Sequence, residues 1–172
     1  MGKYFRMSKR FNKKTPSDFG LTTDAKGDYA IDPEDNSKWK PCSLYDFGWG
    51  NEIGYYRIPL PGFAELLQIS IESNDSDDMY GAAAIILEKY PNDLLEYCEE
   101  LFVPPINKST AKQLINVFQL DQCINRSPIQ GKSFNEITND LTRWQEISRR
   151  AQGLLKNSMD TKNKGLKSIF HI

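Results

Sequence analysis

The side chains in this sequence that could carry chemistry are mainly carboxylates, and several of them are closely spaced. Asp77 and Asp78 are adjacent, and a second group lies at positions 96, 99 and 100. Two carboxylates can cleave a glycosidic or phosphate-ester bond when their surroundings separate their pKa values, or when they hold a metal ion together. The sequence shows no surroundings of that kind, so a carboxylate-based hydrolase is kept only as an alternative.

Other signatures of catalysis or cofactor binding are missing from the sequence. His171 is the single histidine, which leaves no second histidine for a dyad or a zinc cluster, and the three cysteines form no CxxC pair. No Walker-type phosphate loop is present, and the acidic run 32–43 lacks the glycine and glutamate that a calcium loop needs at its sixth and twelfth positions. We therefore expect a protein without enzymatic activity, cofactor or bound metal.

Charge is distributed unevenly along the sequence, although the net charge is only −1. Residues 1–14 contain six basic and no acidic residues, residues 15–105 contain 18 acidic and five basic ones, and residues 106–172 contain 11 basic and five acidic ones. Such asymmetry bears on partners and solubility rather than on fold. One interpretation is an acidic surface that meets a basic partner. The other is a solvated acidic face that the basic ends neutralise.

The first interpretation selects a set of candidate residues. Glu96 and Glu100 lie four residues apart on a predicted helix, where like charges destabilise the helix. Trp and Tyr are enriched at binding hot spots, although aromatic residues in a long loop more often pack against a core. We predict a partner-binding surface formed by solvent-facing sides of two helices and by the 45–56 segment: Asp46, Trp49, Glu52, Asp77, Asp78, Glu96, Glu99 and Glu100.

The N-terminal third of the chain predicts little regular structure. In residues 3–11, apolar residues such as Phe5 alternate with polar ones such as Arg6, which predicts a half-buried strand. Residues 12–52 are rich in Gly, Pro, Asp, Asn and Ser and show no sustained period. They predict a long irregular segment whose aromatic residues pack over the helices, and residues 53–58 predict a second short strand.

From residue 61 onward, the spacing of apolar residues is helical. Stripes at intervals of three and four residues predict helices near residues 63–71, 77–90, 91–103 and 110–118. A capping box at Ser133–Glu136 begins a fifth helix of about 22 residues. We predict a mostly α (α+β) fold, with short N-terminal strands and a long irregular aromatic segment packed on a stack of four to six helices.

The predicted organisation is one compact domain in three parts. Residues 1–60 form the strand and irregular segment, residues 61–157 the helical body, and the Lys- and Asn-rich residues 158–172 a flexible tail. The longest apolar run, residues 82–87, is far shorter than the ~20 residues that span a bilayer. We expect a cytoplasmic protein that does not bind membranes, because no secretory signal and no cysteine framework is evident.

The predicted helices at 77–90 and 91–103 resemble a HEAT-type repeat, with an acidic first turn, an alanine-rich start and a tight proline turn. In size, charge and lack of catalytic motifs, the chain resembles small bacterial immunity proteins, which block a toxin by capping its active site. The resemblance implies a non-enzymatic interaction module, monomeric or weakly dimeric, whose acidic surface meets a basic partner. The alternative is a nucleic-acid-binding accessory protein that uses the basic N-terminal and C-terminal segments, although the acidic middle disfavours phosphate binding.

Overall fold

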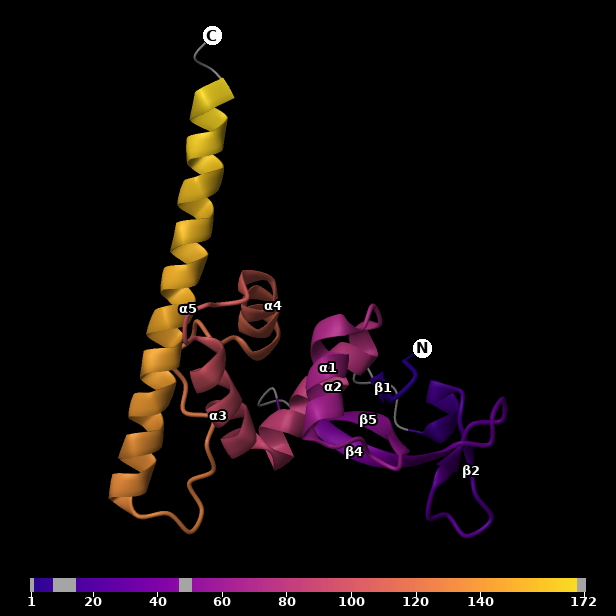
Figure 1. Cartoon of the computed structure of the whole chain (residues 1–172). Coiled ribbons are helices and arrows are strands. Elements are labelled where there is room, and N and C mark those ends of the chain that lie inside the picture. The colour runs from indigo at the N-terminus through magenta and orange to yellow at the C-terminus, as the bar shows by residue number, and fades with distance from the viewer. Residues whose placement is uncertain (1, 8–14, 47–50, 170–172) are drawn as a thin grey trace. The chain divides into compact units, whose positions relative to one another are not determined.

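The computed structural model describes residues 2–7, 15–46 and 51–169, with side chains except at 43–46, 51–53 and 157–169. Over these residues the chain has an α+β fold, with a five-stranded antiparallel sheet and five α-helices (Figure 1). It divides into two compact units, Met1–Tyr90 and Pro91–Ile172. The boundary predicted at residue 60 falls inside the first unit, just before its first helix.

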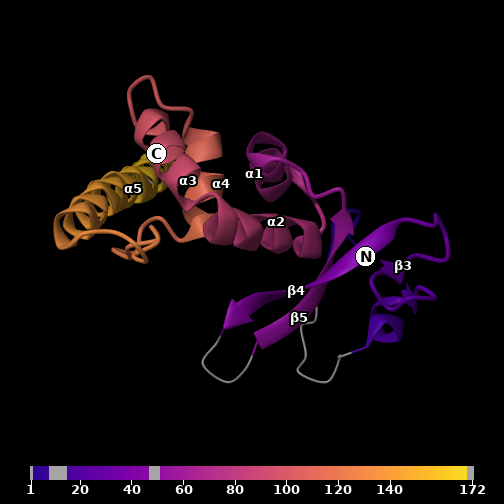
Figure 2. The same cartoon turned by 90° about the horizontal axis from the view of Figure 1, so that it is seen from below.

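The first unit contains the sheet and two helices. The strand order is β1-β5-β4-β3-β2, so the two long strands β4 and β5 are inner strands. Helix α2 packs against β1 and β4, and α1 packs against α2 (Figure 2). The elements are β1 (Phe5–Met7), the 3-10 helix η1 (Pro16–Phe19), β2 (Thr22–Thr23), β3 (Ala30–Ile31), β4 (Lys38–Asp46), β5 (Asn51–Ile58), α1 (Phe63–Glu72) and α2 (Ser76–Lys89).

The prediction of one long irregular segment over residues 12–52 is wrong, because η1, β2, β3, β4 and the start of β5 lie within it. β4 alone covers nine residues, and it pairs with β5, which confirms the strand predicted at 53–58. Trp39 is 1% exposed and joins a small core of the sheet rather than packing over the helices. That core consists of Phe19, Leu21, Ala30, Trp39 and Tyr55. The two-residue strands β2 and β3 are too short to produce an alternating pattern in the sequence.

Two glycines allow the N-terminal strand to lie close to helix α2. A Cβ atom at Gly81 would lie 2.3 Å from the ring of Phe5, which is fully buried. A Cβ atom at Gly2 would lie 2.5 Å from a carboxylate oxygen of Asp78. Side chains at these positions would separate the strand from the helix, so both glycines are required by close approach.

The second unit is helical. It contains α3 (Pro91–Leu101), α4 (Lys108–Phe118) and α5 (Phe134–Ile169), and both shorter helices pack against α5. The buried side of α5 includes Trp144, Ile147 and Ala151. The predicted capping box is confirmed, since the backbone N of Ser133 donates to Glu136 at 2.8 Å.

The four helices predicted between residues 63 and 118 are confirmed within a few residues, but α5 is longer than predicted. It covers 36 residues, and its last part includes most of the segment that the sequence predicts as a flexible tail. Lysine and methionine are good helix formers and no proline interrupts the segment, so its polar composition does not exclude a helix. The HEAT-like pairing of α2 with α3 stays a prediction, because the boundary between the units falls between these helices. Among the described residues, no helix combines the length and the apolar character needed to cross a membrane.

The three cysteines differ in burial, and this difference predicts their reactivity. Burial raises the pKa of the Cys98 thiol to about 12, and desolvation likewise raises the pKa of the half-buried Cys42 to about 12, whereas Cys123 is exposed. The thiolate is the form that reacts with alkylating agents. We therefore expect iodoacetamide at neutral pH to modify Cys123 in the folded protein and all three cysteines after denaturation, as read by mass spectrometry. Equal labelling of Cys98 and Cys123 in the folded protein would contradict this assignment.

Candidate partner-binding surface

Asp78, one of the predicted surface carboxylates, is buried inside the first unit. It is 5% exposed, and its carboxylate accepts hydrogen bonds from the backbone N of Lys3 at 2.8 Å, of Tyr4 at 2.7 Å and of Phe5 at 2.8 Å. The prediction that Asp78 faces solvent is therefore wrong. Its charge binds the N-terminal segment of the chain itself.

Asp77 also accepts a hydrogen bond from the N-terminal strand β1. It is half-buried and accepts a hydrogen bond from the backbone N of Met7 at 3.3 Å. β1 pairs with β5 along one edge only. Its backbone N–H groups point alternately toward β5 and away from it, so those that point away need a different acceptor. Phe5 and Met7 are two residues apart and donate to Asp78 and Asp77 respectively. The first turn of α2 thus covers the edge of the sheet, where acidic residues also suit the helix dipole.

The other three predicted acidic residues with described side chains lie on α3, and they differ in their surroundings. Glu96 and Glu100 are exposed and make no ion pair with another described residue. Glu99 is half-buried and is held by Arg143, whose Nε donates to Oε1 at 2.7 Å and whose Nη2 donates to Oε2 at 2.6 Å. Two of the three carboxylates are therefore exposed and without an ion pair to another described residue.

The Glu99–Arg143 pair shifts the pKa values of both groups. Hydrogen bonds from Arg143 lower the pKa of Glu99, and hydrogen bonds to Glu99 raise the pKa of Arg143. The charges of Glu99, Asp140 and Glu96 raise the pKa of Arg143 further, although partial burial opposes this. The negative charge of Glu96 therefore acts on the same arginine, which links the exposed and the paired carboxylates of α3.

This pair predicts a pH-dependent stability difference. Because the pKa of Glu99 is lower in the folded state, the stabilisation is present above the unfolded pKa and is lost as the pH falls through the folded value. Glu99→Gln should reduce the free energy of unfolding at neutral pH by about 0.5 to 1 kcal/mol, a small effect because the pair is partly exposed. Urea unfolding of both proteins over a pH series should show the difference shrinking in acid. A difference that does not depend on pH would contradict the assignment.

A cleft of about 270 Å³ lies between α3 and α5 within the second unit. Phe102 and Ile147, each 2% exposed, give it an apolar floor, and Val103 is 56% exposed beside them. The lining residues are Glu99, Phe102, Val103, Arg143, Glu146, Ile147 and Arg150.

The α5 wall of this cleft carries two arginines and one glutamate, and Arg149 lies beside it on the same helix. Glu146 accepts hydrogen bonds from Arg149 at 2.6 and 2.7 Å and from Arg150 at 2.7 Å. These hydrogen bonds lower the pKa of Glu146 to about 2. Two guanidinium groups thus share one carboxylate, and the side chain of Arg149 is 72% exposed.

The eight predicted residues do not form one described surface. Residue 46 ends β4 and residue 52 lies near the start of β5, one register position apart across the hairpin. Their side chains, and the whole of Trp49, lie outside the described part of the chain. These three and the two aspartates of α2 belong to the first unit, and the α3 glutamates belong to the second.

The cleft and the apolar side chains that line it could not be predicted from the sequence. Arg143, Ile147 and Arg150 are spaced by four and three residues, which places them on one face of α5, but the spacing does not show which helix they face. Within the residues that the structure describes, no three His, Cys, Asp or Glu side chains are grouped so as to hold a metal ion. Comparison of the chain with protein-family models, with curated proteins and with solved structures finds no match.

Proposed function

We propose that this protein is a non-enzymatic interaction module that binds a partner with a basic surface through helix α3 and the α3–α5 cleft. One observation carries the proposal. Glu96 and Glu100 are exposed on α3 without an ion pair to another described residue, next to a cleft with an apolar floor. All four charged residues of α3 are acidic, so the helix retains mutual repulsion that a cationic partner would relieve.

The cleft supplies the apolar part of such an interaction. A lysine or arginine side chain has an aliphatic stem that packs against apolar surface while its charged end stays at the rim. Val103 and Phe102, which directly follow α3, provide the apolar surface, and Glu96 and Glu100 provide negative charge on α3. Charge complementarity of this kind raises the rate of association and selects against acidic partners.

The specific form of this function that we favour is inhibition of a toxin in the cytoplasm. A toxin that acts on nucleic acid presents a basic cleft to phosphate, and an acidic helix can occupy that cleft instead. The support is the chain's small size, its acidic middle segment and the charge of α3. In this function the aspartates of α2 have no part in binding, because they hold the N-terminal strand.

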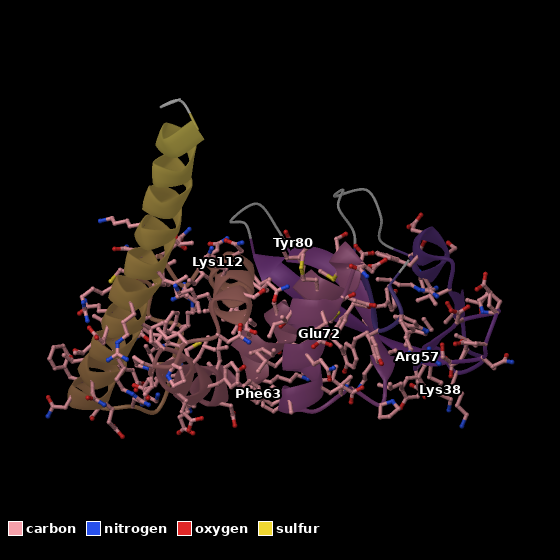
Figure 3. All side chains as sticks on the ribbon, turned by 45° about the horizontal axis from the view of Figure 1, so that its top comes forward. Lys38, Arg57, Phe63, Glu72, Tyr80 and Lys112 are labelled. Atoms are coloured by element: carbon pink, nitrogen blue, oxygen red, sulfur yellow. The ribbon has the colours of Figure 1, made fainter. Side chains whose placement is uncertain are left out.

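The test is a titration with a fluorescent oligolysine peptide as a basic probe. The variant Glu96→Gln with Glu100→Gln should weaken binding at low salt by about tenfold or more. The control is Glu65→Gln with Glu72→Gln on α1, which removes the same charge from two exposed residues of another helix (Figure 3 labels Glu72). Glutamine at position 72 can still accept the hydrogen bond from Gln68. If both double variants weaken binding equally, the probe responds only to net charge and the proposal is contradicted.

A further inference from the structure

We propose that the α3–α5 cleft also binds a second copy of this chain, in a two-fold symmetric dimer. The inference rests on the proposed function, because it names one partner that brings basic residues to that same surface. It follows from the signs of the charges on the two sides of the cleft and from the apolar residues between them.

The charged residues that line the cleft are paired within the chain, Glu99 with Arg143 and Glu146 with Arg150, and the excess charge belongs to residues beside them on each helix. On α3, Arg143 binds Glu99, but Glu96 and Glu100 have no ion pair with another described residue. On α5, Arg149 and Arg150 share the single carboxylate of Glu146. The α3 side therefore has an excess of negative charge and the α5 side an excess of positive charge. Each excess is complementary to the other, but the two lie side by side on one molecule.

A two-fold axis that runs along the cleft brings these opposite charges together. Rotation about such an axis places the α3 side of one copy against the α5 side of the other, and the reverse contact forms at the same time. A two-fold axis that runs across the cleft, from α3 to α5, would instead place the acidic α3 sides of the two copies against each other. Val103, an apolar side chain that is 56% exposed at the cleft, would then be covered near the axis by the same residue of the partner copy. A second copy thus satisfies both sides, whereas a purely basic partner satisfies only α3.

The two partners compete for the same carboxylates. A saturating basic partner should therefore separate the dimer, and the dimer should shield the acidic side of the cleft in the free protein.

The test uses charge reversal on each side and sedimentation equilibrium of the full chain over a concentration series. Glu96→Lys with Glu100→Lys makes both sides basic, and Arg149→Glu with Arg150→Glu makes both sides acidic. We expect the wild-type chain to dimerise reversibly, and each variant alone to dimerise about tenfold or more weakly. An equimolar mixture of the two variants should form a mixed dimer, since both contacts then join opposite charges. Raising the salt concentration should weaken the wild-type dimer and the mixed dimer alike.

Three outcomes would overturn the dimer. These are a wild-type chain that stays monomeric at every concentration, variants that dimerise as well as the wild type, and a mixture that does not associate. Melting curves of each variant show whether it is folded, and the neutral pair Arg149→Gln with Arg150→Gln replaces the reversal if that variant does not fold. A monomeric chain that still loses oligolysine binding on Glu96→Gln with Glu100→Gln removes the dimer and leaves the proposed function standing. If the chain dimerises but Glu96→Gln with Glu100→Gln leaves oligolysine binding unchanged, the dimer stands and the proposed function is contradicted.

Discussion

Asp78→Ala is expected to lower the free energy of unfolding of the first unit by about 3 to 5 kcal/mol. The substitution removes the acceptor for the backbone N–H groups of Lys3, Tyr4 and Phe5, of which the Phe5 group is buried and the other two are partly buried. Removing one member of a buried set of charge-assisted hydrogen bonds costs the desolvation of every group left behind. The N-terminal strand should therefore detach from α2.

Hydrogen exchange of these three amides measures the effect directly, because it reports on the strand without requiring the two units to unfold together. Asp77→Ala is the matched control, since it removes the neighbouring carboxylate, which accepts one longer hydrogen bond of 3.3 Å. It should cost about 1 kcal/mol. Equal protection of the Lys3–Phe5 amides in both variants would show that Asp78 does not hold the strand.

Arg6→Met is expected to destabilise the same unit by about 3 to 5 kcal/mol, for a different reason. The guanidinium lies over the ring of Trp39 at 4.5 Å, donates to the backbone O of Phe19 at 2.9 Å and forms an ion pair with Asp32. Arg6 is 8% exposed and Asp32 is 5% exposed, so removal of the arginine leaves a carboxylate buried without its counter-ion. An unpaired buried charge is costly, whereas a buried ion pair adds little over a neutral replacement.

The double variant Arg6→Met with Asp32→Asn separates these two effects. Asparagine is neutral and can still accept the hydrogen bond that Asp32 takes from the backbone N of Glu34 at 3.0 Å. We expect the double variant to recover more than half of the stability that Arg6→Met loses, as measured by denaturant unfolding of the sheet. A double variant as unstable as the single one would show that packing of the arginine against Trp39, rather than the buried charge, determines the cost.

The helices could be predicted from the sequence because their signals are local. The apolar stripes of α1 to α4 and the capping box before α5 depend on residues three or four positions apart. The sheet could not be predicted to the same extent. Its central pairing joins β4 to β5, but β2 and β3 contain two residues each, and the register of β1 depends on residues about fifty positions later in the chain.

The same difference between local and long-range contacts explains which features of the candidate surface could be predicted from the sequence. The exposure of Glu96 and Glu100 follows from their position on α3, opposite the buried Leu94 and Leu95. The burial of Asp78 depends on a segment more than seventy residues earlier, and the pairing of Glu99 depends on an arginine 44 residues later. The alternation in the sequence predicts Arg6 on the polar side of its strand, but Asp32 and Trp39 provide the partners that allow it to be buried.

The most direct test of the proposed function is the titration of the oligolysine probe against Glu96→Lys with Glu100→Lys at two salt concentrations, beside a melting curve of the free protein. We expect slower and weaker binding with a smaller dependence on salt. We also expect an unchanged or slightly higher melting temperature, because the repulsion between these glutamates disappears. Unchanged affinity with an unchanged melting curve would show that the acidic side of α3 is only a solvated exterior. A collapsed melting curve would show instead that the glutamates hold the fold, and either result would contradict the proposed function.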